Sequence, residues 1–482
     1  CSSDLYARIW SHLGDDLEIK DLLDLRLMTD PGSLATLDVI SKILPPALFT
    51  DANLFSVASC RAVNLSIENG NCDASCVAYV WLGMIAGPRF ENYSAGFEFA
   101  RVGYDLVEKR GLKRFTARTY LWFAQFVMPW NRHIILCRDL MRQAFDAANK
   151  VGDMTIAGYA CNNLNTNMLA AGDSLALTQS EAEKGFEFAQ KARFGFVSDI
   201  IAAQLGLIRT LRGLTQKFGC FDNDTFNESE FERHLAADGT LALPECWYWT
   251  RKLQARFFAG DYDVAVDATL RADRLIWTTP AIFEKAECYF YGALAIAARC
   301  DIAAGPQGCQ YFEMLQKYSR QLEIWSQNCG ENFDGRAALV RAEIARIEGR
   351  ELDAERSYEQ AISSSRTNGF VHIEAVANER AALFYAVRGF RRISDVLLYD
   401  ARYCYLRWGA DGKVQQLDED HPRLATNIYE SGSTSTIGEP IERLDLATVI
   451  QVSQAVAGEI VLDRLIDTLL RNALTHAGAE RA

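Results

Sequence analysis

The sequence predicts an all-α fold: a right-handed superhelical array of antiparallel helix pairs followed by a C-terminal linker helix. Apolar residues recur at helical spacing, small residues recur at fixed distances after glycines, and proline is scarce, with 10 in 482 residues. The composition, 49% hydrophobic and 23% charged, excludes a disordered or collagen-like chain. Each pair of such an array buries its face only against its neighbours, so one array can account for the whole length.

Three glycines, Gly260, Gly349 and Gly389, begin the same pattern. The residues 5 and 12 positions later are small, and the residue 9 positions later is usually bulkier. The sets are Ala265, Thr269 and Ala272; Ala354, Tyr358 and Ala361; Ser394, Leu398 and Ala401. Steps of four and then three stay on one helix face, where small side chains let a second helix lie close. The spacing indicates a tetratricopeptide-like solenoid, although Gly349 and Gly389 are 40 residues apart and the usual unit is about 34.

Other segments fit helices and their connections. Asp30-Pro31 predicts a helix start, and Pro45-Pro46 predicts that this helix stops or kinks. The segment 218–243 lacks the repeat and is expected to be an acidic loop or insertion. The most apolar run, 288–298, has 11 residues, whereas a membrane span needs about 20, so we expect a buried helix and no membrane span.

The character of the chain changes after Ala410. We expect the helical repeat region to cover residues 1–430, a linker rich in Ser, Thr and Gly to cover 431–440, and a connecting helix to begin a further domain over 441–482. A short coiled-coil-like seam repeats at spacings of 3 and 4, at Leu446, Val449, Ser453, Val456 and Ile460. The seam is expected either to form a homodimer through 441–476 or to lie against the same chain.

Motif by motif, the sequence predicts no catalytic, cofactor-binding or metal-ligating residue. The net charge of −13 disfavours nucleic acid. Gly412-Lys413 lacks the remaining residues of a phosphate loop, and His372-Ile-Glu374 lacks the cysteine half of a deaminase zinc signature. Only Cys72 and Cys76 of the thirteen cysteines are close, with no second pair or histidine to complete a zinc set. Reduced thiols in a cytoplasmic protein are the expectation.

Histidines, aromatic residues and arginines each allow two interpretations. The six histidines are expected at the surface or at helix caps rather than as ligands: His12, His133, His234, His372, His421 and His476. Three aromatic groups form either a ligand groove or, as we favour, core: Trp122, Phe123, Phe126 and Trp130; Trp247, Tyr248 and Trp249; Tyr399, Tyr403, Tyr405 and Trp408. Several arginines attract an acidic partner or, as we favour, form a solvated face: Arg388, Arg391, Arg392, Arg402 and Arg407.

Several stretches resemble, in the same order, the helical region of very large bacterial signalling proteins that carry a kinase-like domain, an ATPase module, a GAF domain and a histidine kinase. The matching stretches are Leu27-Met-Thr-Asp-Pro31, Phe49-Thr-Asp-Ala-Asn-Leu-Phe55, Val63-Asn-Leu-Ser66, Tyr79-Val-Trp-Leu-Gly83, Arg402-Tyr-Cys-Tyr-Leu-Arg-Trp-Gly-Ala410, Leu444-Asp-Leu-Ala-Thr-Val-Ile450, Ser453-Gln-Ala-Val-Ala-Gly-Glu-Ile460 and Ala477-Gly-Ala-Glu-Arg481. The resemblance implies that residues 441–482 lead into a GAF domain. It also implies that the catalytic domains lie outside the chain, and Cys1 in place of Met agrees with a segment of a longer protein, unless the start reflects how the segment was chosen.

The resemblance implies a regulatory role without catalysis. The array is expected to contact the kinase-like, ATPase, GAF and histidine kinase domains of its own protein, other signalling proteins or a small ligand, and to need no cofactor. The alternative is a small-molecule-sensing helical arm of an ATPase-type regulator. A stand-alone enzyme would require an acid, base or metal cluster assembled from residues that are distant in the sequence.

Overall fold

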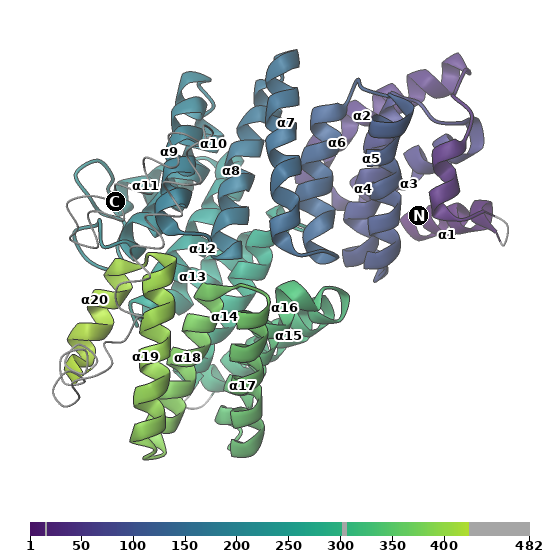
Figure 1. Cartoon of the computed structure of the whole chain (residues 1–482). Helices are drawn as coiled ribbons and strands as arrows, with labels where there is room; N and C mark the ends of the chain where they lie inside the picture. The colour runs from purple at the N-terminus through teal and green to yellow at the C-terminus, as the bar shows by residue number, and fades with distance from the viewer. Residues whose placement is uncertain (15–16, 301–305, 424–482) are drawn as a thin grey trace, which may run out of the picture. The chain divides into compact units, whose positions relative to one another are not determined.

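The computed structural model describes residues 1–14, 17–300 and 306–423, which belong to one compact unit, Cys1–Leu424 (Figure 1). This part of the chain is built from α-helices and short 3-10 or π turns, and its only β-type pairings are two isolated bridges. Successive helices pack as antiparallel pairs. The predicted all-α array is therefore confirmed. The predicted linker at 431–440, the helix at 441–482 and the seam at 441–476 lie outside the described residues.

The N-terminal helices run from the first residues to the middle of the chain. They are α1 (Ser2–Leu13), η1 (Ile19–Asp24), α2 (Pro31–Thr50), α3 (Ala52–Asn69), α4 (Asp73–Phe90), α5 (Tyr93–Arg110), α6 (Thr116–Trp122), η2 (Phe123–Val127), η3 (Met128–Trp130), η4 (Ile134–Cys137), α7 (Arg138–Val151) and α8 (Met154–Ala171). The remaining helices are α9 (Leu175–Lys191), α10 (Gly195–Leu211), α11 (Glu228–Ala236), η5 (Gly239–Leu241), α12 (Ala242–Phe258), α13 (Tyr262–Leu275), η6 (Ile276–Thr278), α14 (Phe283–Cys300), α15 (Pro306–Asn328), α16 (Gly330–Ile347), α17 (Glu351–Thr367), α18 (Val371–Val387), α19 (Arg391–Trp408) and α20 (Asp411–Asp420).

The glycine pattern marks real helix pairs. Gly260, Gly349 and Gly389 end helices with φ of 75°, 71° and 84°, a backbone conformation that a residue with a Cβ rarely adopts. All nine residues at the predicted offsets are buried on α13, α17 and α19. Each of these helices packs against the helix that precedes its glycine. The spacing therefore located three turns and three buried faces from sequence alone.

Two local expectations need correction. Asp30 caps α2 as predicted, with its carboxylate 2.7 Å from the Ser33 amide. Of the two outcomes predicted at Pro45-Pro46, a stop is wrong, because the helix continues through both prolines to Thr50. Proline removes the hydrogen bond of its own nitrogen and crowds the preceding turn, yet α2 remains hydrogen-bonded beyond the two prolines, where the Asp51 amide donates to the Ala47 carbonyl. The segment 218–243 is not a plain loop, because it contains α11, capped by Asn227.

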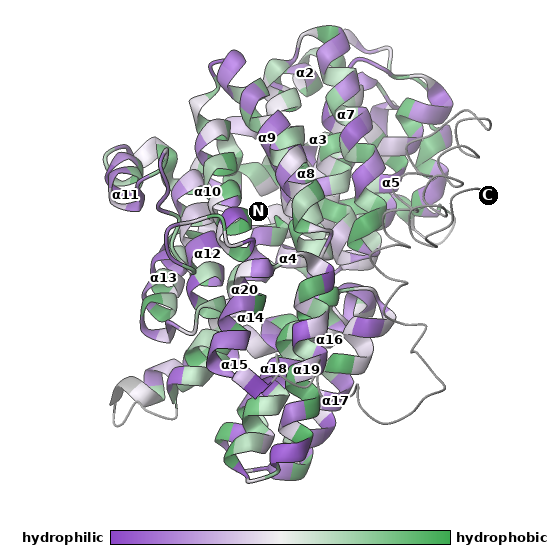
Figure 2. Ribbon diagram, turned by 60° about the vertical axis from the view of Figure 1, so that its left-hand side comes forward, coloured by the Kyte–Doolittle hydropathy of each residue, from purple (hydrophilic) through white to green (hydrophobic). Residues whose placement is uncertain are grey.

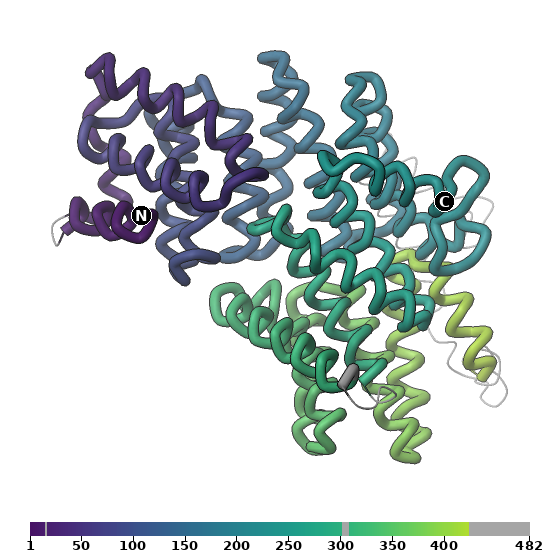
Figure 3. The backbone as a smooth tube through the Cα atoms, turned by 180° about the vertical axis from the view of Figure 1, so that it is seen from behind, coloured from purple at the N-terminus to yellow at the C-terminus, as the bar shows by residue number. Residues whose placement is uncertain are grey.

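The expectation that each helix pair packs only against its neighbours in the array is also wrong. Helix α8 contacts α14, and α10 contacts α20. The Asn332 side chain of α16 donates to the Pro129 carbonyl at 2.7 Å and accepts from the Ile134 amide at 3.0 Å. Lys413 of α20 donates to the Phe258 carbonyl at 2.9 Å. The C-terminal pairs thus fold back on the middle of the chain, as the green and yellow segments show from behind (Figure 3).

The buried hydrophobic residues fall into two clusters. The N-terminal core comes mainly from α1 to α8, and the C-terminal core mainly from α8 to α20. Hydrophobic and hydrophilic residues alternate along most helices in the hydropathy colouring, as helices with one buried face require (Figure 2). The predicted run 288–298 lies within α14 and is largely buried in the C-terminal core.

Candidate functional site

A deep aromatic pocket opens beside the N-terminal core. We call it the aromatic pocket; its cavity volume is about 260 Å³, and it is partly open to solvent. Its lining comes from α2, α3, α4, α6, η2, α8, α10, α12 and the segment after α13. Eight aromatic side chains line it: Phe49, Phe55, Trp81, Trp122, Phe126, Tyr159, Phe196 and Trp247. A concave, mainly apolar lining with a few polar groups is typical of small-molecule binding, and the volume is suited to a small ligand.

A π-helical turn shapes one wall of the pocket. The turn η2 places both Gln125 and Phe126 on the lining. Pro129 lies four residues after Gln125 and has no amide hydrogen, so the Gln125 carbonyl cannot receive its ordinary α-helical bond. The irregular turn follows at that point, and such turns are frequent at functional sites. Local sequence therefore explains why the helix that begins at α6 changes form beside the pocket.

Three carboxamide side chains, those of Gln125, Asn162 and Asn163, line the pocket. Gln125 is only 8% exposed, and its side chain makes no hydrogen bond to any described residue. Asn163 donates to the Tyr159 carbonyl at 2.7 Å, which leaves its amide oxygen without a bond among the described groups. The indole nitrogen of Trp247 is buried and also lacks a partner. The pocket therefore presents an unbonded carboxamide at Gln125 and a free amide oxygen at Asn163 beside the indole nitrogen of Trp247.

The charged residues of the pocket neutralise one another. Arg118 and Asp153 are its only charged lining residues, and the guanidinium donates to one carboxylate oxygen at 3.1 and 3.3 Å. The other carboxylate oxygen caps α8 by accepting from the Ile156 amide at 3.2 Å. The pocket therefore offers aromatic surface and neutral hydrogen-bonding groups, without a free charge among its lining residues.

Most members of the aromatic clusters seen in the sequence fall into one of the two predicted classes, pocket or core, whereas Tyr399 and Tyr403 are exposed on α19. Trp122, Phe126 and Trp247 line the aromatic pocket, whereas Trp130 lies in the C-terminal core, stacked at 5.7 Å on Phe333. The other core members are Phe123, Tyr248, Trp249, Tyr405 and Trp408. Trp81, which faces Trp122 at 5.0 Å, was missed as a pocket residue because it is isolated in the sequence. Its helix, α4, carries a nearly continuous apolar run, and only the fold shows which residue faces a cavity.

Histidines and Lys413 lie apart from any catalytic cluster. His12 and His234 contact Glu68 and Asp199 at the surface, at 3.1 and 3.0 Å. His372 contradicts the expected surface position, because it is 1% exposed and neither ring nitrogen has a partner. Burial, reinforced by nearby Arg336, lowers the pKa of His372 well below its ordinary value and keeps the ring neutral.

The remaining fragments of familiar motifs have structural roles. Lys413, from the incomplete phosphate loop, is buried against Glu379 at 2.7 Å. His133 accepts from the Ile135 amide at the start of η4, as a cap. His476 lies outside the described residues. Within the described part of the chain, no three His, Cys, Asp or Glu residues are placed to hold a metal ion.

Ion pairs cross the C-terminal core. Arg251 pairs with Glu284, and Arg336 pairs with Glu287 at 3.2 Å, all four side chains being essentially inaccessible. Glu343 accepts from Arg380 at 2.8 and 3.0 Å, from Arg346 at 2.9 Å and from Tyr358 at 3.0 Å. Burial alone would raise the pKa of Glu343, but Arg380 and Arg346 outweigh it and lower that pKa to about 2. Burial prevails at Glu284 and raises its pKa despite Arg251.

These buried charges connect helices. The pairs Arg251–Glu284, Arg336–Glu287 and Arg380–Glu343 each join two different helices among α12, α14, α16 and α18. In each pair a carboxylate is bonded to a guanidinium. The network therefore explains cohesion of the C-terminal helices.

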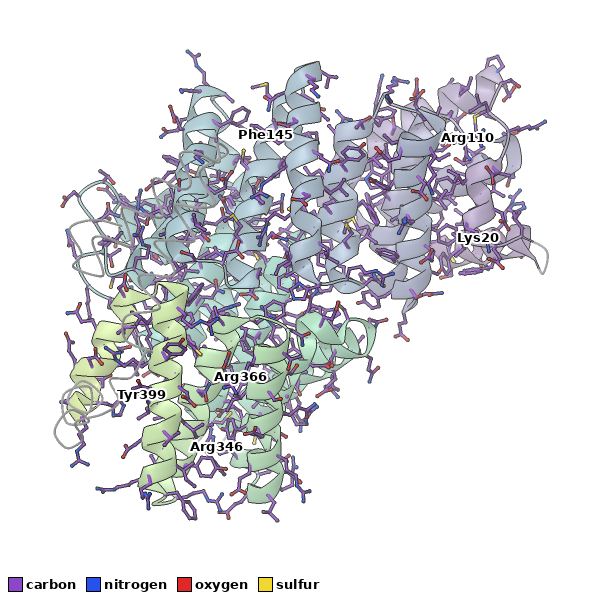
Figure 4. All side chains as sticks on the ribbon, viewed as in Figure 1. Lys20, Arg110, Phe145, Arg346, Arg366 and Tyr399 are labelled. Atoms are coloured by element: carbon purple, nitrogen blue, oxygen red, sulfur yellow. The ribbon has the colours of Figure 1, made fainter. Side chains whose placement is uncertain are left out.

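The outer face of α19 is apolar, unlike that of α17. Val396, Tyr399, Tyr403 and Leu406 are 42–61% exposed and repeat at spacings of three or four, which places them on one face. Figure 4 labels Tyr399 on this helix. Arg392 and Arg407 adjoin this stripe, and neither forms an ion pair with a described residue. In contrast, Arg388 bonds Glu351 and Glu355 of α17, and Arg402 bonds Asp418 of α20.

Part of the chain is distantly similar to a known protein. Over 179 residues, or 37% of this chain, the sequence is 23% identical to Hybrid signal transduction histidine kinase G of Dictyostelium discoideum. The matched region is 5% of the length of that protein, so the chain corresponds to a small part of it. No family model matches the chain. Among the described helices, none has the length and apolarity needed to cross a bilayer. The similarity indicates a connection with signalling.

Proposed function

We propose that this chain is a non-catalytic regulatory segment of a multidomain sensor histidine kinase, in which it mediates protein–protein or interdomain contacts. Two findings support the proposal: the distant similarity to a hybrid histidine kinase and the all-helical repeat array. Arrays of helix pairs present extended surfaces on which partners bind. The kinase-like, ATPase, GAF and histidine kinase domains of the parent protein, and a cytoplasmic location, belong to this proposal.

The apolar outer face of α19 carries the proposal. The C-terminal core already uses the opposite face of α19, including Leu398, Ala401 and Tyr405. The exposed stripe, with Arg392 and Arg407 beside it, fits an amphipathic helix whose apolar face is bordered by acidic residues. The flanking domains of the same protein are the proposed source of that helix.

Titration of residues 1–482 against the separately prepared flanking domains tests this function. We expect saturable binding that weakens at least tenfold when Tyr399 and Tyr403 are both replaced by Ser, and not when exposed Leu177 is replaced by Ser. Deletion of the array from the parent protein should change histidine kinase output. The proposal is wrong if the domains do not bind and the deletion leaves that output unchanged.

The second candidate function is small-molecule sensing by the helical arm of an ATPase-type regulator, and the aromatic pocket favours it. A ligand that binds only the folded chain raises its melting temperature. A thermal-shift screen with uncharged and charged metabolites separates this candidate from pure scaffolding. Absence of any concentration-dependent shift, at ligand levels up to the millimolar range, contradicts sensing.

A further inference from the structure

We infer that the aromatic pocket binds an uncharged, planar aromatic molecule bearing a hydrogen-bond donor and acceptor side by side, as in a primary carboxamide or a lactam. The inference rests on the second candidate function and names its ligand class. It is tested by direct binding to this chain, whereas regulation is tested by kinase output, so either can fail while the other stands.

The shape and surface of the pocket call for a flat aromatic ligand. Trp81 and Trp122 face each other at 5.0 Å with ring planes 31° apart, and Phe126, Phe196 and Trp247 come from three further elements. Aromatic rings stack or meet edge to face with favourable energy beyond the area they bury. An aliphatic chain would fill the same space without these contacts.

Charge balance selects an uncharged ligand. Each charged lining residue is already satisfied, Arg118 by Asp153 and Asp153 by Arg118 and the α8 amide. A charged ligand would lose its hydration and find no counter-charge among the lining residues, which is strongly unfavourable in an apolar site.

The unbonded carboxamide of Gln125 indicates which polar group the ligand carries. It supplies a donor and an acceptor side by side, and a ligand carboxamide or lactam matches both at once. The free amide oxygen of Asn163, which also lines the pocket, adds a second acceptor. Gln125 lies on the π-helical turn, so its position depends on a local irregularity that the fold retains beside the pocket.

Three probes with one ring system test the inference: 2-naphthamide, 2-naphthoate and 2-naphthylmethylammonium. Binding to the 482-residue chain is measured by isothermal titration and by ligand-observed NMR. We expect 2-naphthamide to bind saturably and each charged probe at least tenfold more weakly. Equal binding of the three probes, or absence of 2-naphthamide binding at its solubility limit, overturns the inference.

Two variants locate the binding. Gln125→Leu should weaken 2-naphthamide at least fivefold while the melting temperature is retained, because the side chain has no protein partner to lose. Trp122→Ala should weaken it about tenfold, and Trp277→Ala, a tryptophan exposed outside the pocket, should not. If 2-naphthamide binds with the same affinity to both pocket variants, the ligand lies elsewhere and the assignment is wrong.

Discussion

The N-terminal and C-terminal cores fill the space between helix pairs in different ways. Among the described side chains, every Asp, Glu, Lys or Arg that is fully buried lies between Glu228 and Lys413, and the buried polar groups before Glu228 are uncharged. Aromatic rings and small residues fill the N-terminal core, which leaves a pocket beside it. The C-terminal core is also mainly hydrophobic and aromatic, but three buried ion pairs between helices cross it. One repeat architecture thus has a pocket beside its N-terminal core and buried ion pairs within its C-terminal core.

The largest expected effect on stability is that of Glu343→Gln, which tests whether buried ion pairs stabilise the C-terminal helices. The variant leaves buried Arg380 without its anionic partner, and removal of one member of a buried pair typically costs about 3–5 kcal/mol. Denaturant unfolding should show a loss of this size. Glu348→Gln, at an exposed pair with Arg350, should change the free energy of unfolding by less than about 1 kcal/mol. Equal effects of the two variants would mean that the buried pairs do not hold this half together.

Acid should remove the stabilisation that the ionised Glu343 carboxylate gives to the fold. The pKa of Glu343 is about 2 in the folded chain against an ordinary value of 4.5, so its carboxylate stabilises the fold fully above pH 4.5 and progressively less as the pH falls towards 2. The shift corresponds to about 3 kcal/mol. The difference in unfolding free energy between the native chain and Glu343→Gln should therefore narrow from pH 5 to pH 3. A constant difference over that range contradicts the assignment.

The N-terminal half should respond instead to added volume. A Cβ on Gly103 would lie 2.3 Å from the Cys76 carbonyl oxygen, because α4 and α5 approach closely there. Gly103→Ala should reduce the free energy of unfolding by about 1–3 kcal/mol, as overfilled cores do. Gly195→Ala, where no atom lies within 4 Å, is the matched control and should be neutral. Unfolding by urea distinguishes the two; a neutral Gly103→Ala would mean that this contact is loose.

The smallest expected effect is that of Gln125→Leu on stability. Replacement of an unpaired buried polar group by an apolar one of similar shape is near neutral or stabilising. We expect a change within about 0.5 kcal/mol by thermal unfolding. A larger loss would show that Gln125 holds the N-terminal core together and is not reserved for a ligand. The control is Asn332→Leu, which removes bonds to Pro129 and Ile134 and should destabilise clearly.

Local features of the fold were predictable because they depend on neighbouring residues. The glycine offsets identified the buried faces of α13, α17 and α19, and Asp30-Pro31 identified the start of α2. The pairing of Arg251 with Glu284, 33 residues apart, was not predictable, because it depends on how α12 and α14 pack against each other. A ligand groove was the less favoured interpretation of the groups that contain Trp122 and Trp247, and its lining could not be assembled for the same reason: Phe55, Trp122 and Trp247 converge only in the folded array.

The bonds from the last helices to the middle of the chain alter how the array should respond to force. In an open solenoid, tension peels repeats away one after another, each yielding at its own load. Here the Lys413 side chain donates a hydrogen bond to the Phe258 carbonyl, 155 residues away in the sequence. The Asn332 side chain donates to the Pro129 carbonyl, 203 residues away. Strain applied near Asp420 therefore reaches α12, whose residue Trp247 lines the aromatic pocket, without passing through each intervening repeat.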